Sequence, residues 1–309
     1  MKQEPGFRWG YAVFVLIILA VIGFFAAGIL SLFVGVDVKS LSGNVAVIPI
    51  EGVILGSDDS GSFFESTATS QDIVELIEKA DENTGIKAII LEINSPGGSA
   101  VASEEIANAV KRTNKTTVAW IREVGASGAY WVASASDHIV ASRVSVTGSI
   151  GVIGSYIEFP GLLTRYNITY QRLVSGDYKD IGSPYKEMTN EERVIFLRYL
   201  DEIRDYFAGE VAKNRNLSKK DVDKAANGLF YLGAEAQSLG LVDELGGKEE
   251  VIRYIEKKEG IKAELVEYKN EKTLFDVLSK VMSRQSFFVG KGIGSAFLDK
   301  RVSTIAITT

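Results

Sequence analysis

The segment REVGASGAYWVASASDHIVAS, residues 122–142, places a serine between small residues at the close of an expected turn. A serine hydroxyl is a weak nucleophile and needs a neighbouring base, most often histidine. The only histidine of the chain, His138, follows Ser127 by eleven residues. The chain between them reads as about two helical turns followed by a new strand, which carries the imidazole away from Ser127. We therefore interpret His138 as the first residue of a strand, and not as the base.

A lysine replaces histidine as the base if its amine loses its proton near neutral pH, which apolar surroundings favour. Lys179 lies in SGDYKDIGSP, 52 residues after Ser127, in an expected loop at a strand end. Its position alone does not select it among the other lysines of the chain.

A peptide or ester carbonyl attacked by serine also needs donors for the negative oxygen that develops. Backbone N–H groups from a glycine-rich turn and from a helix N-terminus supply them. The turn SPGGS, residues 95–99, is a candidate for the first donor, and Gly128, directly after Ser127, for the second.

Strand and helix patterns alternate along the chain, which predicts an α/β domain with a parallel sheet and flanking helices. The expected strands are 44–54, 86–94, 116–121 and 138–142, and the expected helices are 70–82, 99–113 and 125–136. Ligands of such sheets bind beyond the carboxyl ends of the strands. The SPGGS turn and Ser127 both follow an expected strand, so we expect them at one edge of the sheet.

The second half of the chain contains fewer clear patterns. We expect a strand, a turn and a short helix within 148–166, and a strand from Ile168 that leads into the loop of Lys179. Thr189 and Glu192 form a capping box ahead of an amphipathic helix. Further helices are expected after Ser218 and over 248–258.

Several motifs resemble, in order and spacing, the S49 peptidase family of signal peptide peptidases in its short, single-copy form. They are LEINSPGGSAVAS, GASGAYWVASASDHIVAS, TGSIGVIG, GDYKDIGSPYKEMTNEER and GLFYLGAEAQSLGLVDELGG, within residues 44–260. The resemblance implies a ClpP/crotonase-like fold and a Ser/Lys dyad. It implies Ser127 as nucleophile, Lys179 as general base and then acid, Gly98 and Gly128 as oxyanion donors, and Ser149 as a hydrogen-bond partner that orients the lysine.

The resemblance also implies a homo-oligomeric ring in which Ser127 of one subunit faces Lys179 of the next. The implied substrates are the hydrophobic remnants of cleaved signal peptides. No cofactor is implied, and the chain has no Walker P-loop for ATP. Two alternatives stay open: a crotonase-type acyl-CoA enzyme, in which the Ser127/Lys179 pair is incidental, and a membrane scaffold that has lost activity.

The run from Trp9 to Val36 contains no charged residue and is long enough to cross a bilayer with tilt. Lys2 and Arg8 precede the run, whereas Asp37 and Lys39 follow it. The positive-inside rule then predicts a single-pass cell-membrane protein with a cytoplasmic N-terminus and an extracytoplasmic catalytic domain.

The net charge and the counts of cysteine and histidine exclude several kinds of partner and metal site. The net charge of −6 argues against a nucleic-acid partner, and the absence of cysteine together with a single histidine excludes cysteine-based zinc sites and histidine-rich metal sites. The expected organisation is a cytoplasmic N-terminus (1–8), a membrane anchor (9–36), a linker (37–43), the peptidase domain (44–265) and a C-terminal tail (266–309) that includes a candidate amphipathic helix.

Overall fold

The computed structural model describes residues 18–19, 23, 43–57 and 67–269. The expected membrane segment 9–36 lies almost wholly outside these residues, as does the tail beyond 269. Within the described part of the chain, no helix has both the length and the apolar character needed to cross a membrane. Residues 42–269 form one compact unit, which contains all the motifs discussed above.

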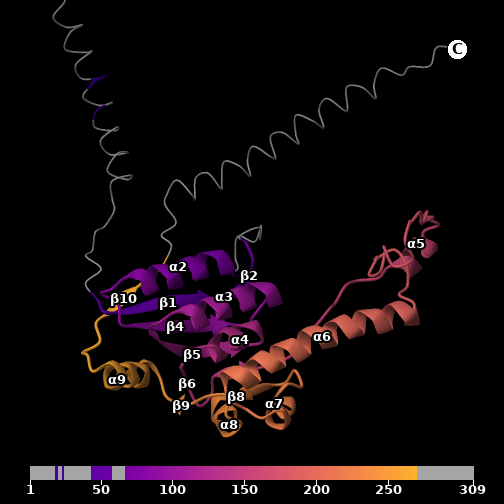
Figure 1. The fold of residues 1–309 in the computed structure, drawn as a ribbon. Coiled ribbons are helices and arrows are strands. Elements are labelled where there is room, and N and C mark those ends of the chain that lie inside the picture. The colour runs from indigo at the N-terminus through magenta and orange to yellow at the C-terminus, as the bar shows by residue number, and fades with distance from the viewer. Residues whose placement is uncertain (1–17, 20–22, 24–42, 58–66, 270–309) are drawn as a thin grey trace, which may run out of the picture. The chain divides into compact units, whose positions relative to one another are not determined.

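This unit is a mixed α/β domain (Figure 1). The strands are β1 (Val45–Glu51), β2 (Val53–Leu55), β3 (Thr67–Thr69), β4 (Ala88–Ser95), β5 (Thr116–Ala126), β6 (His138–Ala141), β7 (Val146–Gly148), β8 (Phe230–Leu232), β9 (Glu244–Leu245) and β10 (Leu265–Glu267). The helices are α2 (Ser70–Glu82), α3 (Ala100–Arg112), α4 (Gly128–Ser134), α5 (Pro160–Arg165), α6 (Asn190–Asn214), α7 (Lys219–Ala225), α8 (Gly233–Ser238) and α9 (Lys248–Glu259).

The main sheet has the order β10-β1-β4-β5-β6-β9, and all of these strands are parallel. The last residues of β5 leave β6 and pair instead with β7, and β7 pairs antiparallel with β8. β4 and β5 run side by side to their carboxyl ends, where Ser95 is in register with Gly125. The predicted parallel sheet is therefore confirmed, and the SPGGS turn and Ser127 leave it at the same edge.

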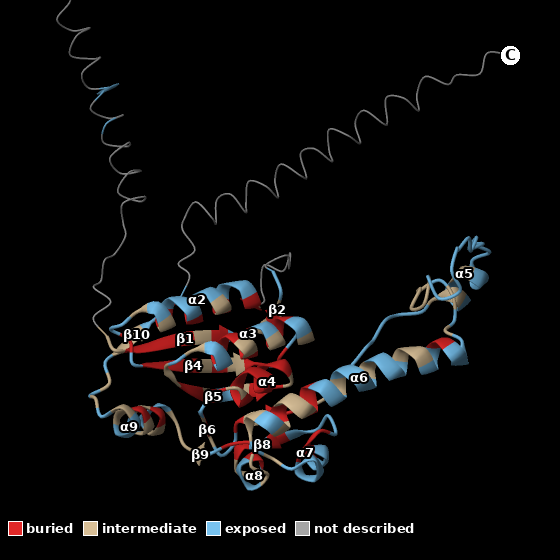
Figure 2. Ribbon diagram, in the orientation of Figure 1, coloured by how far each residue is buried: buried red, intermediate tan, exposed pale blue. Residues whose placement is uncertain are grey.

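Alternate residues of the strands fill two different cores, as parallel sheets covered on both faces require. Ala46, Ile48 and Ile50 of β1 pack with residues of α2, α3 and α4. Val45 and Val47 of the same strand pack in a second cluster with Val251 and Ile255 of α9. Figure 2 shows the strands and α4 as the buried centre of the domain.

The predicted helix over 70–82 matches α2 at both ends. Its N-terminus is fixed because Thr69 accepts a hydrogen bond from the Asp72 N–H at 3.2 Å.

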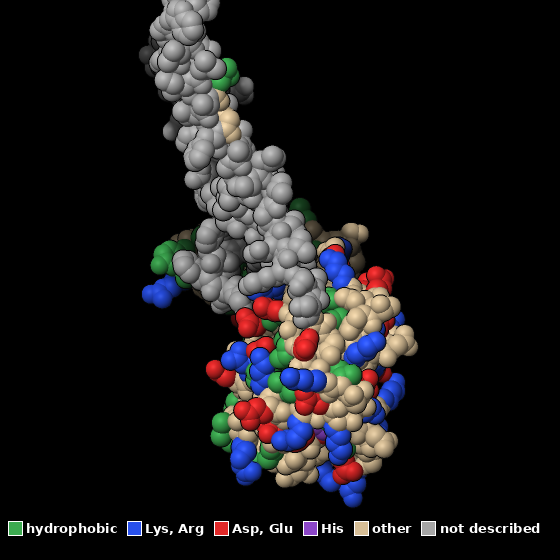
Figure 3. All heavy atoms as spheres, turned by 90° about the vertical axis from the view of Figure 1, so that its left-hand side faces the viewer, with side chains coloured by type: hydrophobic (Ala, Val, Ile, Leu, Met, Phe, Trp, Pro, Cys, Tyr) green, Lys and Arg blue, Asp and Glu red, His purple; other side chains and the backbone are tan. Residues whose placement is uncertain are grey.

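On the α9 side of the domain, acidic and basic side chains are interspersed over the surface (Figure 3). That face is therefore a solvated outer layer over the second core.

Helix α6 begins outside the body of the domain and ends inside it (Figure 1). Its C-terminal part buries Phe207, Ala208 and Val211, whereas most of its N-terminal part is exposed (Figure 2). We call residues 155–195, which include α5 and the first turns of α6, the arm. The prediction of a strand from Ile168 is wrong. Residues 168–174 lie in the arm, where no strand of the described chain runs beside them to accept and donate the hydrogen bonds of a sheet.

Candidate active site

Ser127 occupies a sharp turn between the end of β5 and the start of α4. Its backbone has φ 53° and ψ −126°, a conformation that costs a residue with a side chain of the order of 1–3 kcal/mol. Two hydrogen bonds hold the turn: the Ser127 N–H donates to the Gly148 carbonyl at 2.8 Å, and the Ser127 carbonyl accepts from the Trp131 N–H at 3.0 Å. A strained serine at a strand-to-helix turn is the geometry by which α/β hydrolases expose a nucleophile.

The turn after β4 lies against Ser127 and is built around glycine. Gly97 has φ +95°, and a Cβ added to it would lie 2.7 Å from the Gly128 nitrogen and 2.9 Å from the Ser127 Cβ. A side chain at position 97 would therefore both strain the backbone and push the serine turn away.

The amides of Gly98 and Gly128 lie side by side. A Cβ added to Gly128 would be only 3.4 Å from the Gly98 nitrogen. In the part of the chain that the structure describes, neither amide donates a hydrogen bond to a protein acceptor. Two adjacent free donors beside a serine hydroxyl suit the stabilisation of an oxyanion.

Strand β2 fixes the Gly98 amide from behind. The Ile54 N–H donates to the Gly97 carbonyl at 2.9 Å, and the Ile54 carbonyl accepts from the Ser99 N–H at 2.8 Å. On the other side, Ser103 of α3 is fully buried under Gly128, and a Cβ added to Gly128 would lie 2.1 Å from its hydroxyl oxygen.

A cleft of about 760 Å³ opens over Ser127. Gly98, Gly128 and Ser149 line it, so the structure brings together four of the five predicted site residues. One wall is apolar: the rings of Trp131 and Phe207 stack with centroids 4.8 Å apart, and these residues join α4 to α6.

Ser149 has a second unusual backbone conformation, with φ 51°. Its N–H donates to the Leu229 carbonyl at 2.8 Å, and its hydroxyl donates to the Gly228 carbonyl at 3.4 Å. Ser149 is half-buried and lines the cleft. Because its hydrogen bond to the Gly228 carbonyl is long, the hydroxyl can exchange it for a hydrogen bond to another group in the cleft.

Lys179 does not line the cleft. It lies in the arm, is exposed, and makes no ion pair with a described residue. Figure 1 shows the arm at the N-terminal end of α6, away from the body of the domain. A single chain thus does not place the predicted base beside the predicted nucleophile.

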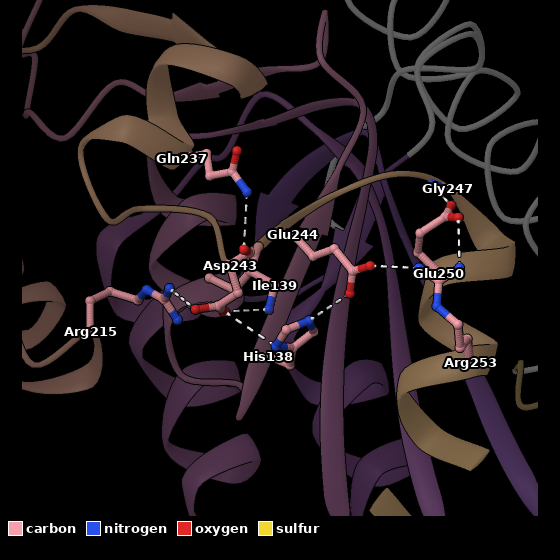
Figure 4. Close-up of polar contacts among 9 residues, drawn as sticks. All are labelled: His138, Ile139, Arg215, Gln237, Asp243, Glu244, Gly247, Glu250 and Arg253. Atoms are coloured by element: carbon pink, nitrogen blue, oxygen red, sulfur yellow. Dashed lines mark hydrogen bonds and ion pairs between the residues drawn. The ribbon is translucent and has the colours of Figure 1, made fainter. Parts of the chain in front are cut away.

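His138 begins β6, as its sequence context predicts, and does not line the cleft. Its ring lies between two carboxylates, with Nδ1 3.8 Å from Asp243 and Nε2 3.4 Å from Glu244 (Figure 4). It also stacks on Tyr254 of α9, with centroids 3.8 Å apart. Arg215 forms an ion pair with Asp243, and Arg253 forms one with Glu244. We therefore interpret the His138 cluster as structural, since its contacts join β6, β9 and α9.

Ile54, Gly97 and Ser103 also shape the site. Gly97 belongs to the SPGGS turn that the sequence indicates as a candidate, although the sequence gives it no separate role. Ile54 and Ser103 carry no signal, because their contacts with Gly98 and Gly128 join parts of the chain that only the fold brings together.

An α/β domain with a strained serine beside two free amides, at the carboxyl edge of a parallel sheet, defines a serine hydrolase. Comparisons with known proteins show to which family of serine hydrolases the chain belongs. The model of Peptidase family S49 matches residues 109–262. Among curated proteins, a putative protease of Methanocaldococcus jannaschii is 34% identical over 76% of this chain and 76% of its own length.

A putative signal peptide peptidase of Enterococcus faecium is 32% identical, over 75% of this chain and 68% of its own length. Protease 4 of Haemophilus influenzae is 31% identical over 69% of this chain and 34% of its own length. The chain therefore belongs to peptidase family S49, and it is a serine peptidase.

Proposed function

We propose that this chain is a membrane-anchored endopeptidase that uses a Ser127/Lys179 dyad to degrade remnant signal peptides and similar hydrophobic peptides after their release. The observation that carries the proposal is the strained Ser127, which lines one open cleft together with Gly98 and Gly128, whose amides have no protein acceptor among the described residues. Each component has a defined task in peptide-bond hydrolysis.

In the proposed reaction, the neutral Lys179 amine takes the proton of the Ser127 hydroxyl as its oxygen attacks the peptide carbonyl. The Gly98 and Gly128 amides donate hydrogen bonds to the resulting oxyanion. The Lys179 ammonium then gives its proton to the leaving amine, and an acyl-enzyme remains on Ser127. Water, deprotonated by the same lysine, attacks the ester carbonyl, and the bond between the Ser127 oxygen and the acyl carbon then breaks. The lysine returns the proton to the Ser127 oxygen as the peptide acid leaves. Ser149 would accept a hydrogen bond that orients the lysine.

Because one chain keeps Lys179 away from its own cleft, we propose that the lysine acts on Ser127 of an adjacent subunit in a homo-oligomeric ring. The composition of the arm supports this arrangement. It exposes many large apolar side chains, which are Tyr156, Ile157, Leu162, Tyr166, Ile168, Tyr170, Leu173, Val174, Tyr178, Tyr185 and Val194. Exposed apolar side chains gathered on one segment of a chain are typical of an interface, so they favour contact with another copy.

The proposed substrate class and location rest on three features. The apolar cleft wall of Trp131 and Phe207 suits the leucine-rich cores of signal peptides. The uncharged segment 9–36 would anchor the chain in the cell membrane, with the N-terminus cytoplasmic and the catalytic domain outside. The name of the Enterococcus faecium relative gives the same substrate class.

A covalent serine-directed probe tests the nucleophile. Purified full-length protein in detergent is incubated with an acylating probe, and labelled peptides are mapped by mass spectrometry beside hydrolysis of a leucine-rich reporter peptide. We expect labelling at Ser127 and loss of both labelling and hydrolysis in Ser127→Ala. Full activity of Ser127→Ala, or turnover of acyl-CoA in place of peptides, would overturn the proposed function.

A further inference from the structure

The turn that carries Lys179 is attached to the start of α6 on both sides of the lysine. Tyr178, the residue before it, donates a hydrogen bond from its hydroxyl to Glu191 at 2.5 Å. Asp180, the residue after it, is paired with Lys186, and Lys186 is in turn paired with Glu192. Within the turn, the Lys179 N–H donates to the Gly176 carbonyl at 3.2 Å.

Arg172 binds the same carboxylate of Asp180 that pairs with Lys186. Its guanidinium donates two hydrogen bonds, from Nε to Oδ2 at 2.7 Å and from Nη2 to Oδ1 at 2.9 Å. This two-point contact fixes direction as well as distance, which a single ammonium contact does not. The guanidinium, followed by Lys186, lowers the pKa of Asp180, so the carboxylate stays charged over the range in which a peptidase works.

Glu192 anchors the other end of the network. It is 4% exposed, and it belongs to the capping box in which the Thr189 N–H donates to its Oε2 at 2.9 Å. The bond from Lys186, and then that from Thr189, lowers the pKa of Glu192. The lysine turn is thereby connected to α6, whose other end contributes Phe207 to the wall of the cleft.

We propose that the network of Arg172, Asp180, Lys186 and Glu192, together with the Tyr178–Glu191 hydrogen bond, positions Lys179 for its role as general base. This inference rests on the proposed function. The network holds the backbone on both sides of the lysine and leaves the amine free, because within the described residues Lys179 takes part in no ion pair.

The network also compensates the charge closest to the lysine in sequence. Asp180 alone would favour the ammonium form of its neighbour, which cannot act as a base. Pairing with Arg172 and Lys186 offsets that carboxylate. Besides Lys179 itself, the ionisable groups of the segment 172–192 are Arg172, Asp177, Tyr178, Asp180, Tyr185, Lys186, Glu187, Glu191 and Glu192.

The test compares pH–rate profiles of full-length variants on the reporter peptide. Arg172→Gln leaves the carboxylate less compensated, so we expect the acidic limb of kcat/KM to move up by about half a pH unit. Asp180→Asn removes the carboxylate that pairs with Arg172, whereas Lys186 keeps its pairing with Glu192, so the limb moves down by about the same amount. Both variants lower kcat by about 10- to 100-fold, because the base is held less well.

Two further variants separate geometry from charge and from general damage. Arg172→Lys keeps the charge but loses the forked contact, so kcat falls while the acidic limb stays in place. Arg165→Gln removes an exposed arginine of the same arm that has no ion pair within the described residues, and it behaves like the wild type. Subunit number is measured on each sample by light scattering.

Opposite movements of the limb in Arg172→Gln and Asp180→Asn support the proposal, because partial unfolding of the arm would not produce them. Profiles and kcat values equal to those of Arg165→Gln overturn it. Ser127→Ala and Lys179→Ala are assayed in parallel. If both are inactive while the network variants match the wild type, only the positioning role fails; if either keeps full activity, the proposed function fails.

Discussion

Gly98→Ala is the substitution that the geometry of the site resists most strongly. A Cβ at position 98 would lie 2.0 Å from the carbonyl oxygen of Ile54 and 2.7 Å from its nitrogen. Both are backbone atoms, so no side-chain rotation relieves the overlap. Because non-bonded heavy atoms make contact at about 3.5 Å, the turn and β2 must separate by more than about 1 Å.

That displacement is larger than an oxyanion donor tolerates, since its useful distance range is about 2.7–3.1 Å. Loss of one such donor typically lowers kcat by about 10²- to 10³-fold, or about 2.7–4 kcal/mol. We therefore expect Gly98→Ala to lower kcat on the reporter peptide by that factor. KM should change much less, because the oxyanion forms only in the transition state.

The assay measures kcat and KM on protein whose folded fraction is checked by circular dichroism. Gly209→Ala is the matched control, because position 209 lies inside α6, and beyond the neighbouring backbone of that helix an added Cβ would meet no atom within 4 Å. A kcat of Gly98→Ala within about threefold of the wild type would show that the Gly98 amide does not bind the oxyanion, and the assignment of the glycine turn would be wrong.

Three further outcomes follow from the same structure. Gly209→Ala should raise the free energy of unfolding by about 0.5–1 kcal/mol in urea denaturation, because glycine weakens a helix interior; no change would contradict this. Asp243→Ala should lower it by about 2 kcal/mol without changing kcat per folded site, because Asp243 accepts a hydrogen bond from the Ile139 N–H at 2.8 Å and pairs with the nearly buried Arg215. The pKa of Glu192 is lower in the folded chain than in the unfolded chain, so its stabilisation is present above about pH 4.3 and is lost as the pH falls through its folded pKa. Glu192→Gln should therefore flatten the acid side of the stability–pH curve, and an unchanged slope there would count against the pairing.

The sequence predicts the sheet and its edge well because local signals agree with the fold. Helix α2 has a cap at Thr69 and a regular apolar stripe, and both of its ends match the prediction. The motifs around Gly98 and Ser127 follow buried strands, so their meeting at one edge follows from parallel pairing alone.

Other features depend on contacts that no local pattern encodes. The packing of Ser103 under Gly128 and of Ile54 behind Gly98 joins distant segments. The segment from Ile168 has the composition of a strand, but a strand needs a neighbour, and the described chain offers it none. The position of Lys179 in an arm outside the cleft has the same origin, since the length and direction of α6 set it.

The central claim, that Ser127 and a lysine from another subunit form one active site, is tested most directly by mixing two inactive variants. Ser127→Ala and Lys179→Ala are co-expressed at equal levels and purified as mixed assemblies. In a ring assembled at random, about one quarter of the interfaces join an intact serine to an intact lysine, so we expect about one quarter of wild-type activity. Each variant alone stays inactive. No recovery of activity in verified mixed assemblies would contradict the account.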